Sequence, residues 1–232
     1  MKGRNVMIAV AIDGPSGAGK STIARKVAGE LGFLYIDTGA LYRSIGYYVL
    51  KKGGDPERKE DVEAALPGIR LELRHADGVQ RVFLNGEDVS DQIRTPAVSM
   101  AASHVSAFPA VRAFLLELQR KMAREHNVIM DGRDIGTVVL PDAELKIFLT
   151  ATPEDRARRR YEELVEKGEA VTFDEVLKDV IQRDYNDTHR DIAPLRQAED
   201  AVLADTTGFE LPQSVALIRS LVEKKLGKET AR

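Results

Sequence analysis

The sequence predicts an α/β fold: a doubly wound, five-stranded parallel sheet with a small antiparallel β insert. Three observations predict it. Five short apolar runs alternate with amphipathic segments, a glycine-rich loop follows the first run, and one stretch of period-2 alternation with tight turns interrupts the pattern. The chain has 232 residues, of which 43% are hydrophobic, which suits one domain with an insertion and is enough to bury a core.

The first apolar run, residues 6–12, is rich in β-branched residues, as in a buried parallel strand. Residues 21–31 follow as an amphipathic helix, and between them Gly14 to Ser21 match G-x-x-x-x-G-K-[ST]. Backbone N–H groups and a helix N-terminus surround nucleotide phosphates in such a loop. Lys20 would reach the outer phosphates, and the Ser21 hydroxyl would bind Mg²⁺. The loop alone does not separate a kinase from a switch GTPase or an ATP-driven motor.

The remaining elements of the parallel sheet follow in order. Asp37 to Gly39 are expected to turn the chain after the second strand, and Thr152 and Pro153 are a strong helix start. Further strands are predicted at residues 34–36, 128–130, 145–149 and 201–203. Helices are predicted at residues 40–50, 61–66, 95–106, 109–124, 152–168, 173–190 and 211–225.

Residues 68–90 form the predicted insert. Apolar and charged residues alternate over 69–74 and again over 79–84, and 87–89 can add a third short strand. Asp77-Gly78 and Asn85-Gly86 are hairpin turn signals. Two tight turns so close together do not belong to a parallel sheet, because parallel strands need long crossovers. The insert divides the predicted core into residues 1–67 and 91–232.

Composition and missing motifs narrow the function. The net charge of −3 disfavours an RNA-binding ATPase, and the absence of N-K-x-D disfavours a GTPase switch. The chain has no cysteine and no apolar run of membrane-spanning length. We therefore expect a cytoplasmic protein that binds neither nucleic acid nor membrane.

Two charged clusters fall where ligands of such sheets bind, or on helices near that edge. Asp131 ends an apolar strand and can bind the hydration shell of Mg²⁺. Arg133 can bind a phosphate, and Asp134 can accept hydrogen bonds from a base or sugar. The alternative is a charged turn whose members pair with each other. Arg156, Arg159 and Arg160 share one helix face, which suits either phosphate binding or a solvated surface.

A third set, Arg183, Asp187 and Arg190, has the spacing of one helical stripe. Local spacing favours an intrahelical ladder of ion pairs, and the neighbouring Asp184 could pair as well.

Taken together, these motifs resemble those of bacterial cytidylate (CMP) kinase, in order and over nearly the whole chain. The matching strings are Ile12 to Ser21, Asp37-Thr38-Gly39-Ala40-Leu41-Tyr42-Arg43, Asp131-Gly132-Arg133-Asp134-Ile135-Gly136-Thr137-Val138-Val139, and the late Arg183, Asp187 and Arg190. The resemblance implies a P-loop kinase fold, a reaction of ATP with CMP or dCMP, and Mg²⁺ as cofactor. It further implies that the insert belongs to a monophosphate-binding domain and that about 152–170 form a helical lid. We expect a monomer.

The resemblance also implies roles for single residues. Lys20, Arg133, Arg156, Arg159 and Arg160 would be catalytic. Arg43, Arg133 and Arg190 would hold the monophosphate, Ser103, Arg112 and Asp134 would read cytosine, and Arg183 and Asp187 would meet the ribose. Some relatives carry glycine at position 21, so a direct Mg²⁺ role for Ser21 stays open beside the indirect role of Asp131. The implied ATP site is Gly14, Pro15, Ser16, Gly17, Ala18, Gly19, Lys20, Ser21 and Thr22; the implied CMP site is Thr38, Arg43, Ser103, Arg112, Arg133, Asp134, Arg183, Asp187 and Arg190.

The main alternative to a CMP kinase is another kinase of the same fold that acts on UMP, AMP or shikimate. The two are distinguished by which of these molecules accepts the phosphoryl group.

Overall fold

The computed structural model describes residues 7–76 and 79–229. The chain forms two compact units. One unit combines Met1–Tyr35 with His126–Arg232, and the other is Ile36–Glu125. We call them the phosphate-loop unit and the inner unit, respectively.

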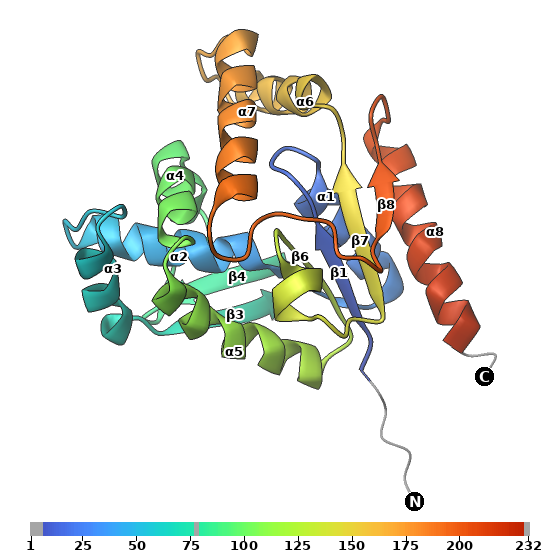
Figure 1. Ribbon diagram of the computed structural model, residues 1–232, viewed down its shortest axis with the longest axis horizontal. Helices are drawn as coiled ribbons and strands as arrows, with labels where there is room; N and C mark the ends of the chain where they lie inside the picture. Colours follow the sequence, from blue (N-terminus) through green and yellow to red (C-terminus); the bar gives the residue numbers. More distant parts are fainter. Residues whose placement is uncertain (1–6, 77–78, 230–232) are drawn as a thin grey trace, which may run out of the picture. The chain divides into compact units, whose positions relative to one another are not determined.

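A five-stranded parallel sheet contributes four of its strands to the phosphate-loop unit (Figure 1), as the sequence predicts, and its remaining strand, β2, begins in that unit and ends in the inner unit. Its order is β2-β6-β1-β7-β8, and β1 pairs in parallel with both β6 and β7. Every residue of β1 is buried, which explains why that strand reads as a continuous apolar run. The strands are β1 (Ala9–Asp13), β2 (Leu34–Asp37), β6 (Val128–Gly132), β7 (Leu145–Thr150) and β8 (Val202–Asp205).

The described residues of this unit also form four α-helices: α1 (Lys20–Leu31), α6 (Pro153–Glu166), α7 (Phe173–His189) and α8 (Leu211–Glu229). α1 packs on α8, and both contribute to a core with Ile12, Ile129 and Ile147. α6 packs on α7 around a separate small cluster that contains Leu164 and Val180. A π-helical turn, Ile135–Val139 (η3), follows β6 and was not predicted.

The inner unit contains the predicted antiparallel sheet, in the order β3-β4-β5. Its second turn is confirmed, because Asn85 and Gly86 both have positive φ, at 52° and 86°. The first predicted turn, Asp77-Gly78, lies outside the described residues. The elements are α2 (Thr38–Lys51), α3 (Lys59–Ala65), η1 (Leu66–Gly68), β3 (Leu71–Ala76), β4 (Val79–Leu84), β5 (Glu87–Asp88), η2 (Gln92–Arg94), α4 (Pro96–Val105) and α5 (Pro109–Glu125).

The predicted turn at Asp37 to Gly39 is wrong. Asp37 ends β2, and α2 begins at the next residue, Thr38. The Asp37 side chain accepts a hydrogen bond from the backbone N–H of Ala40 at 2.9 Å. Because this cap satisfies a free N–H of the first helical turn, the helix can begin without an intervening turn.

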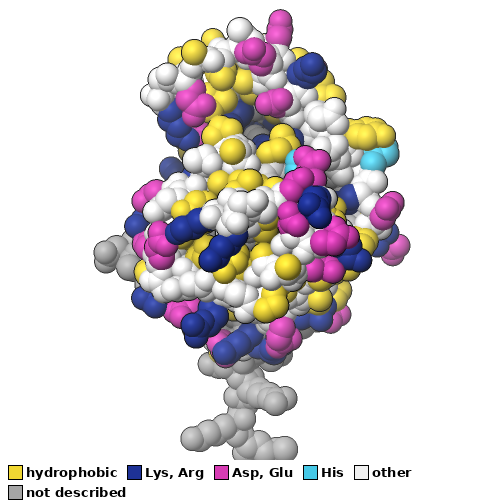
Figure 2. All heavy atoms as spheres, turned by 90° about the vertical axis from the view of Figure 1, so that its left-hand side faces the viewer, with side chains coloured by type: hydrophobic (Ala, Val, Ile, Leu, Met, Phe, Trp, Pro, Cys, Tyr) yellow, Lys and Arg dark blue, Asp and Glu magenta, His cyan; other side chains and the backbone are white. Residues whose placement is uncertain are grey.

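The surface carries charge of both signs. Figure 2 shows basic and acidic side chains interspersed over the face that it presents. None of the helices in the described part of the chain combines the length and the apolar character needed to cross a bilayer.

Candidate active site

The phosphate loop joins β1 to α1, and its lysine is buried. Lys20 is the first residue of α1, and its Nζ donates to the carbonyl oxygen of Pro15 at 2.7 Å. Burial lowers the pKa of Lys20 to about 7, and the positive charge of Arg133 adds to this, while Asp131 and Asp187 act against it. Near neutral pH the buried amine is therefore divided between its neutral and charged forms, and an anionic partner would favour the charged form.

Asp131 connects the loop to the end of β6. The Ser21 hydroxyl donates to Oδ2 of Asp131 at 2.9 Å, and the Tyr35 hydroxyl donates to Oδ1 at 2.8 Å. Asp131 is 4% exposed. A hydroxyl and a carboxylate thus lie together at the start of α1 and the end of β6.

Asp13, the last residue of β1, precedes the phosphate loop and was given no role in the sequence analysis. Its two carboxylate oxygens accept hydrogen bonds from the backbone N–H groups of Ile135 and Gly136, each at 2.7 Å. Burial raises the pKa of Asp13 to about 6, against the lowering effect of these two hydrogen bonds. The carboxylate ties the π-helical turn, which follows Arg133 and Asp134, to the start of the phosphate loop.

Arg133 and Asp134 both pair with residues of the α7 region. Arg133 Nε donates to Oδ2 of Asp187 at 2.7 Å, and Arg190 Nη2 lies 3.8 Å from Oδ1 of Asp134. Burial acts to raise the pKa of Asp187, but Arg133 outweighs it and the pKa lies below its usual value. For Arg133, burial acts to lower the pKa, and Asp187 reverses the effect. Both groups are therefore held in their charged forms.

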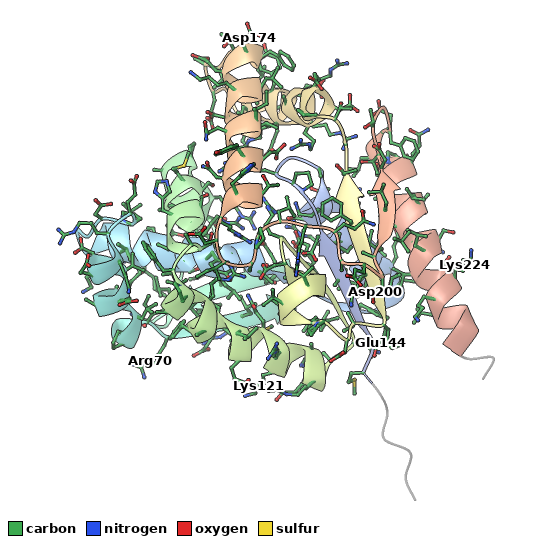
Figure 3. All side chains as sticks on the ribbon, viewed as in Figure 1. Arg70, Lys121, Glu144, Asp174, Asp200 and Lys224 are labelled. Carbon is green, nitrogen blue, oxygen red and sulfur yellow. The ribbon has the colours of Figure 1, made fainter. Side chains whose placement is uncertain are left out.

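Of the predicted stripe on α7, Arg183 contacts the phosphate loop and Asp187 bonds to Arg133. Arg183 Nη1 lies 3.4 Å from the Ser16 hydroxyl, and its pKa is lowered by burial and by Arg133. α7 ends at His189, so Arg190 lies one residue beyond the helix. Asp174, in the first turn of α7, stands at the end of the helix remote from these residues (Figure 3).

The three arginines of α6 have different surroundings. Arg156 is 3% exposed and bonds to the backbone and to Asp184. Arg159 Nη2 donates to the carbonyl oxygen of Thr206 at 2.6 Å, in the loop after β8. Arg160 pairs with Glu163 at 2.8 Å and is partly exposed. One helix face carries all three, but only Arg156 is buried.

The inner unit contains four of the residues predicted to bind CMP. Thr38 and Arg43 lie in the first half of α2, and the other two lie on α4 and α5. Arg43 Nη2 donates to Asp37 Oδ2 at 2.7 Å, and Thr38 is buried beside this pair. Burial acts to raise the pKa of Asp37, but Arg43 and Arg94 lower it below its usual value. The predicted arginine therefore has a charged carboxylate partner.

Ser103 lies on α4 and Arg112 on α5. Arg112 donates to the carbonyl oxygen of Ser106 at 3.3 Å, and its guanidinium lies 5.7 Å from the ring centre of Tyr42. These contacts fix where the Arg112 side chain lies.

The sequence analysis did not identify several residues that bond to the predicted site residues. Asp13, Tyr35 and Asp37 bond to site residues, and none was assigned a role of its own. The sequence does contain a pattern that points to such residues, because Asp13 and Asp131 each follow an apolar run directly. The Asp184–Arg156 pair had none, because 28 residues separate its members.

Within the described ranges, no group of three or more His, Cys, Asp or Glu side chains is placed to hold a metal ion. Any metal here would depend on fewer protein ligands, such as Ser21 and Asp131.

Comparison with known proteins identifies the family. Residues 10–224 match the model of the family described as cytidylate kinase. A cytidylate kinase of Carboxydothermus hydrogenoformans is 49% identical over 216 residues, which cover 93% of this chain and 97% of that protein. A cytidylate kinase of Lactobacillus johnsonii is 45% identical over 224 residues, 97% of each chain.

A solved structure of an uncharacterized protein from Eubacterium ventriosum is similar in fold alone. Its TM-score is 0.52 at 11% identity, and the match covers 94% of this chain and 99% of that one. Because the family model spans most of the chain and the two relatives match nearly their whole length, this chain belongs to the cytidylate kinase family.

Proposed function

We propose that this protein transfers the γ-phosphoryl group of ATP to CMP or dCMP and releases ADP with CDP or dCDP. Membership of the cytidylate kinase family supports the acceptor. The observation that carries the chemistry is the buried Lys20 of the phosphate loop, whose charge interacts with those of Asp131, Arg133 and Asp187. A buried ammonium among organised charges is the arrangement that stabilises charge on a transferring phosphoryl group.

The phosphate loop binds ATP in this proposal, through residues Gly14 to Thr22. Backbone N–H groups of the loop and of the first turn of α1 hold the phosphate oxygens. Lys20 neutralises charge on the β- and γ-phosphates as the bond to the γ-phosphorus breaks. No general base is required, because a phosphate monoester carries ionised oxygens near neutral pH.

The residues present fit a Mg²⁺ ion. Ser21 and Asp131 offer oxygen atoms beside the loop, of the kind Mg²⁺ prefers, and few protein ligands suffice because this ion keeps several waters. Ser21 would hold it directly or through water, and Asp131 would act through its hydration shell. When bound, the ion supplies positive charge to the β- and γ-phosphate oxygens.

On the acceptor side, we propose that Arg43, Arg133 and Arg190 bind the monophosphate. Guanidinium groups suit this because they bind phosphate with two parallel hydrogen bonds. We assign cytosine recognition to Ser103, Arg112 and Asp134, the ribose to Arg183 and Asp187, and a contact with the acceptor to Thr38. These assignments rest on the motifs in the sequence.

Arg159 and Arg160 belong to the proposed lid, about residues 152–170, and we propose that they neutralise charge on ATP. Closure of such a lid excludes water, which would otherwise compete with CMP as the acceptor. We further propose that the protein acts as a monomer in the cytoplasm, which its lack of cysteine suits.

An acceptor panel tests the proposal. ADP formation is measured in a coupled assay with Mg-ATP and each of CMP, dCMP, UMP, AMP, GMP and shikimate. We expect rapid turnover with CMP and dCMP, and at least ~10²-fold lower kcat/KM with the others. A site whose polar groups form hydrogen bonds with one base leaves some of these groups without partners when a different base binds. Preference for UMP, AMP or shikimate would refute the acceptor assignment and leave the phosphate-loop assignment intact.

A further inference from the structure

The guanidinium of Arg156 joins the phosphate loop to α7. Nη1 donates to the carbonyl oxygen of Ser16 at 2.9 Å, and Nε donates to that of Ala151, also at 2.9 Å. Nη1 and Nη2 bond to the two carboxylate oxygens of Asp184, at 2.9 and 2.5 Å. We propose that Arg156 and Asp184 are positioning residues, which hold α7 against the phosphate loop and so set where Arg183 and Asp187 stand relative to Lys20. This inference rests on the proposed kinase activity.

The donor count of Arg156 favours positioning over direct contact with phosphate. A guanidinium has five N–H donors, and the four bonds above occupy four of them. Only one N–H, on Nη2, is left, so Arg156 cannot hold a phosphate with two hydrogen bonds without giving up one of its bonds to Ser16, Ala151 or Asp184. The sequence analysis placed Arg156 with the catalytic arginines, and we now assign it a different role.

The loop is shaped for this contact. A Cβ at Gly17 would lie 3.1 Å from Arg156 Cβ and 3.2 Å from its carbonyl oxygen, and Gly17 has φ +76°. Only glycine adopts this conformation readily and also lets the first turn of α6 approach so closely. The phosphate loop and α6 therefore meet backbone to backbone at the point where Arg156 binds.

A second link runs parallel to the first. Arg183, next to Asp184 on α7, reaches the Ser16 hydroxyl at 3.4 Å, while Arg156 holds the Ser16 carbonyl oxygen. One turn further along α7, Asp187 bonds to Arg133. A shift of α7 along its axis would therefore move Arg183 and Asp187 together. A misplacement of about 1 Å at reacting groups can lower turnover by about 10²-fold.

The test is a double-mutant cycle with Arg156→Lys and Asp184→Asn. Arg156→Lys keeps the charge and loses the fork, and Asp184→Asn keeps the shape and loses the charge. We measure kcat, KM for ATP and for CMP, and the thermal midpoint. The matched control pair is Arg219→Lys and Glu223→Gln, an exposed arginine–carboxylate pair on α8 with a distance of 2.8 Å.

We expect each single substitution at Arg156 or Asp184 to lower kcat by about 10- to 100-fold with KM for ATP within about 3-fold of the wild-type value. The double variant should be no slower than the slower single variant, because both remove the same link. The control pair should leave kcat unchanged. Asp184→Glu keeps the charge and should recover part of the loss, which also covers the case in which Asp184→Asn fails to fold.

Losses that multiply in the double variant would overturn the inference, because Arg156 would then act on substrate independently of Asp184. Unchanged kcat with a lowered thermal midpoint would also overturn it, by showing a purely structural pair. A wild-type enzyme inactive on every acceptor would instead refute the proposed function, and the inference with it.

Discussion

At the scale of single residues, burial decides the chemistry of the phosphate loop. Lys20 and Asp13 are each about 5% exposed, and burial moves their pKa values in opposite directions, to about 7 and about 6. Both shifts disfavour charge in the absence of a ligand. We therefore expect Lys20 to gain a proton when an anion binds beside it.

We predict that ATP binding at pH 8 takes up close to one proton on Lys20. With a pKa of about 7 the amine is largely neutral at that pH, and ATP phosphates raise the pKa because they stabilise the ammonium form. Calorimetric titrations in buffers of different ionisation enthalpy measure the uptake. Lys20→Arg is the control, because arginine stays charged. Equal uptake by both proteins would contradict the prediction.

At the scale of elements, close packing restricts one helix interface of the inner unit. α2 crosses α4 at Gly46, where an added Cβ would lie 2.9 Å from Ala101 Cβ and 3.0 Å from the Ala101 carbonyl carbon. Gly29 on α1 is the opposite case, since a Cβ there would have no neighbour within 4 Å. Both glycines lie in helix interiors, so they differ in their packing.

We predict opposite effects for the same substitution at these two positions. Gly46→Ala should lower the free energy of unfolding by about 1–3 kcal/mol, because the overpacked methyl separates α2 from α4. Gly29→Ala should raise it by up to about 1 kcal/mol through helix propensity. Urea unfolding of the two variants and the wild type measures both values. A higher free energy of unfolding for Gly46→Ala would contradict the prediction, by showing that α2 and α4 accommodate the methyl group without losing stability.

At the scale of the whole molecule, each unit has a hydrophobic core of its own. In the phosphate-loop unit, Ile12, Ile129 and Ile218 belong to one cluster, and in the inner unit Leu41 and Leu115 belong to another. Buried apolar contacts set the free energy of local opening, so each core should govern the protection of its own unit.

We predict that core truncations act mainly within the unit that contains them. Leu115→Ala removes a fully buried side chain and should cost about 2–5 kcal/mol locally. Hydrogen exchange measured by mass spectrometry should accelerate more in α2, α4 and α5 than in β1 and α1. Ile218→Ala, in α8, is the reciprocal control and should show the reverse pattern. Equal acceleration in both units for both variants would show that the protein unfolds as one cooperative unit.

The sequence by itself determined most of the elements of this protein and the position of its phosphate loop. Five apolar runs became the five strands, and the Gly14 to Ser21 motif lies between β1 and α1 as predicted, because hydrophobic periodicity and glycine spacing act over a few residues. The family motifs, read in order along the chain, also identified the family to which it belongs.

Only the tertiary structure decided which charges pair and which strands are neighbours. Arg133 bonds to Asp187, 54 residues away, and Arg156 bonds to Ser16, 140 residues away. Local spacing had grouped Arg156 with Arg159 and Arg160, although burial and partners separate them. Such pairings depend on which segments the sheet order brings together. No rule of helix or strand periodicity reaches over that distance, because periodicity describes one element and pairing joins several.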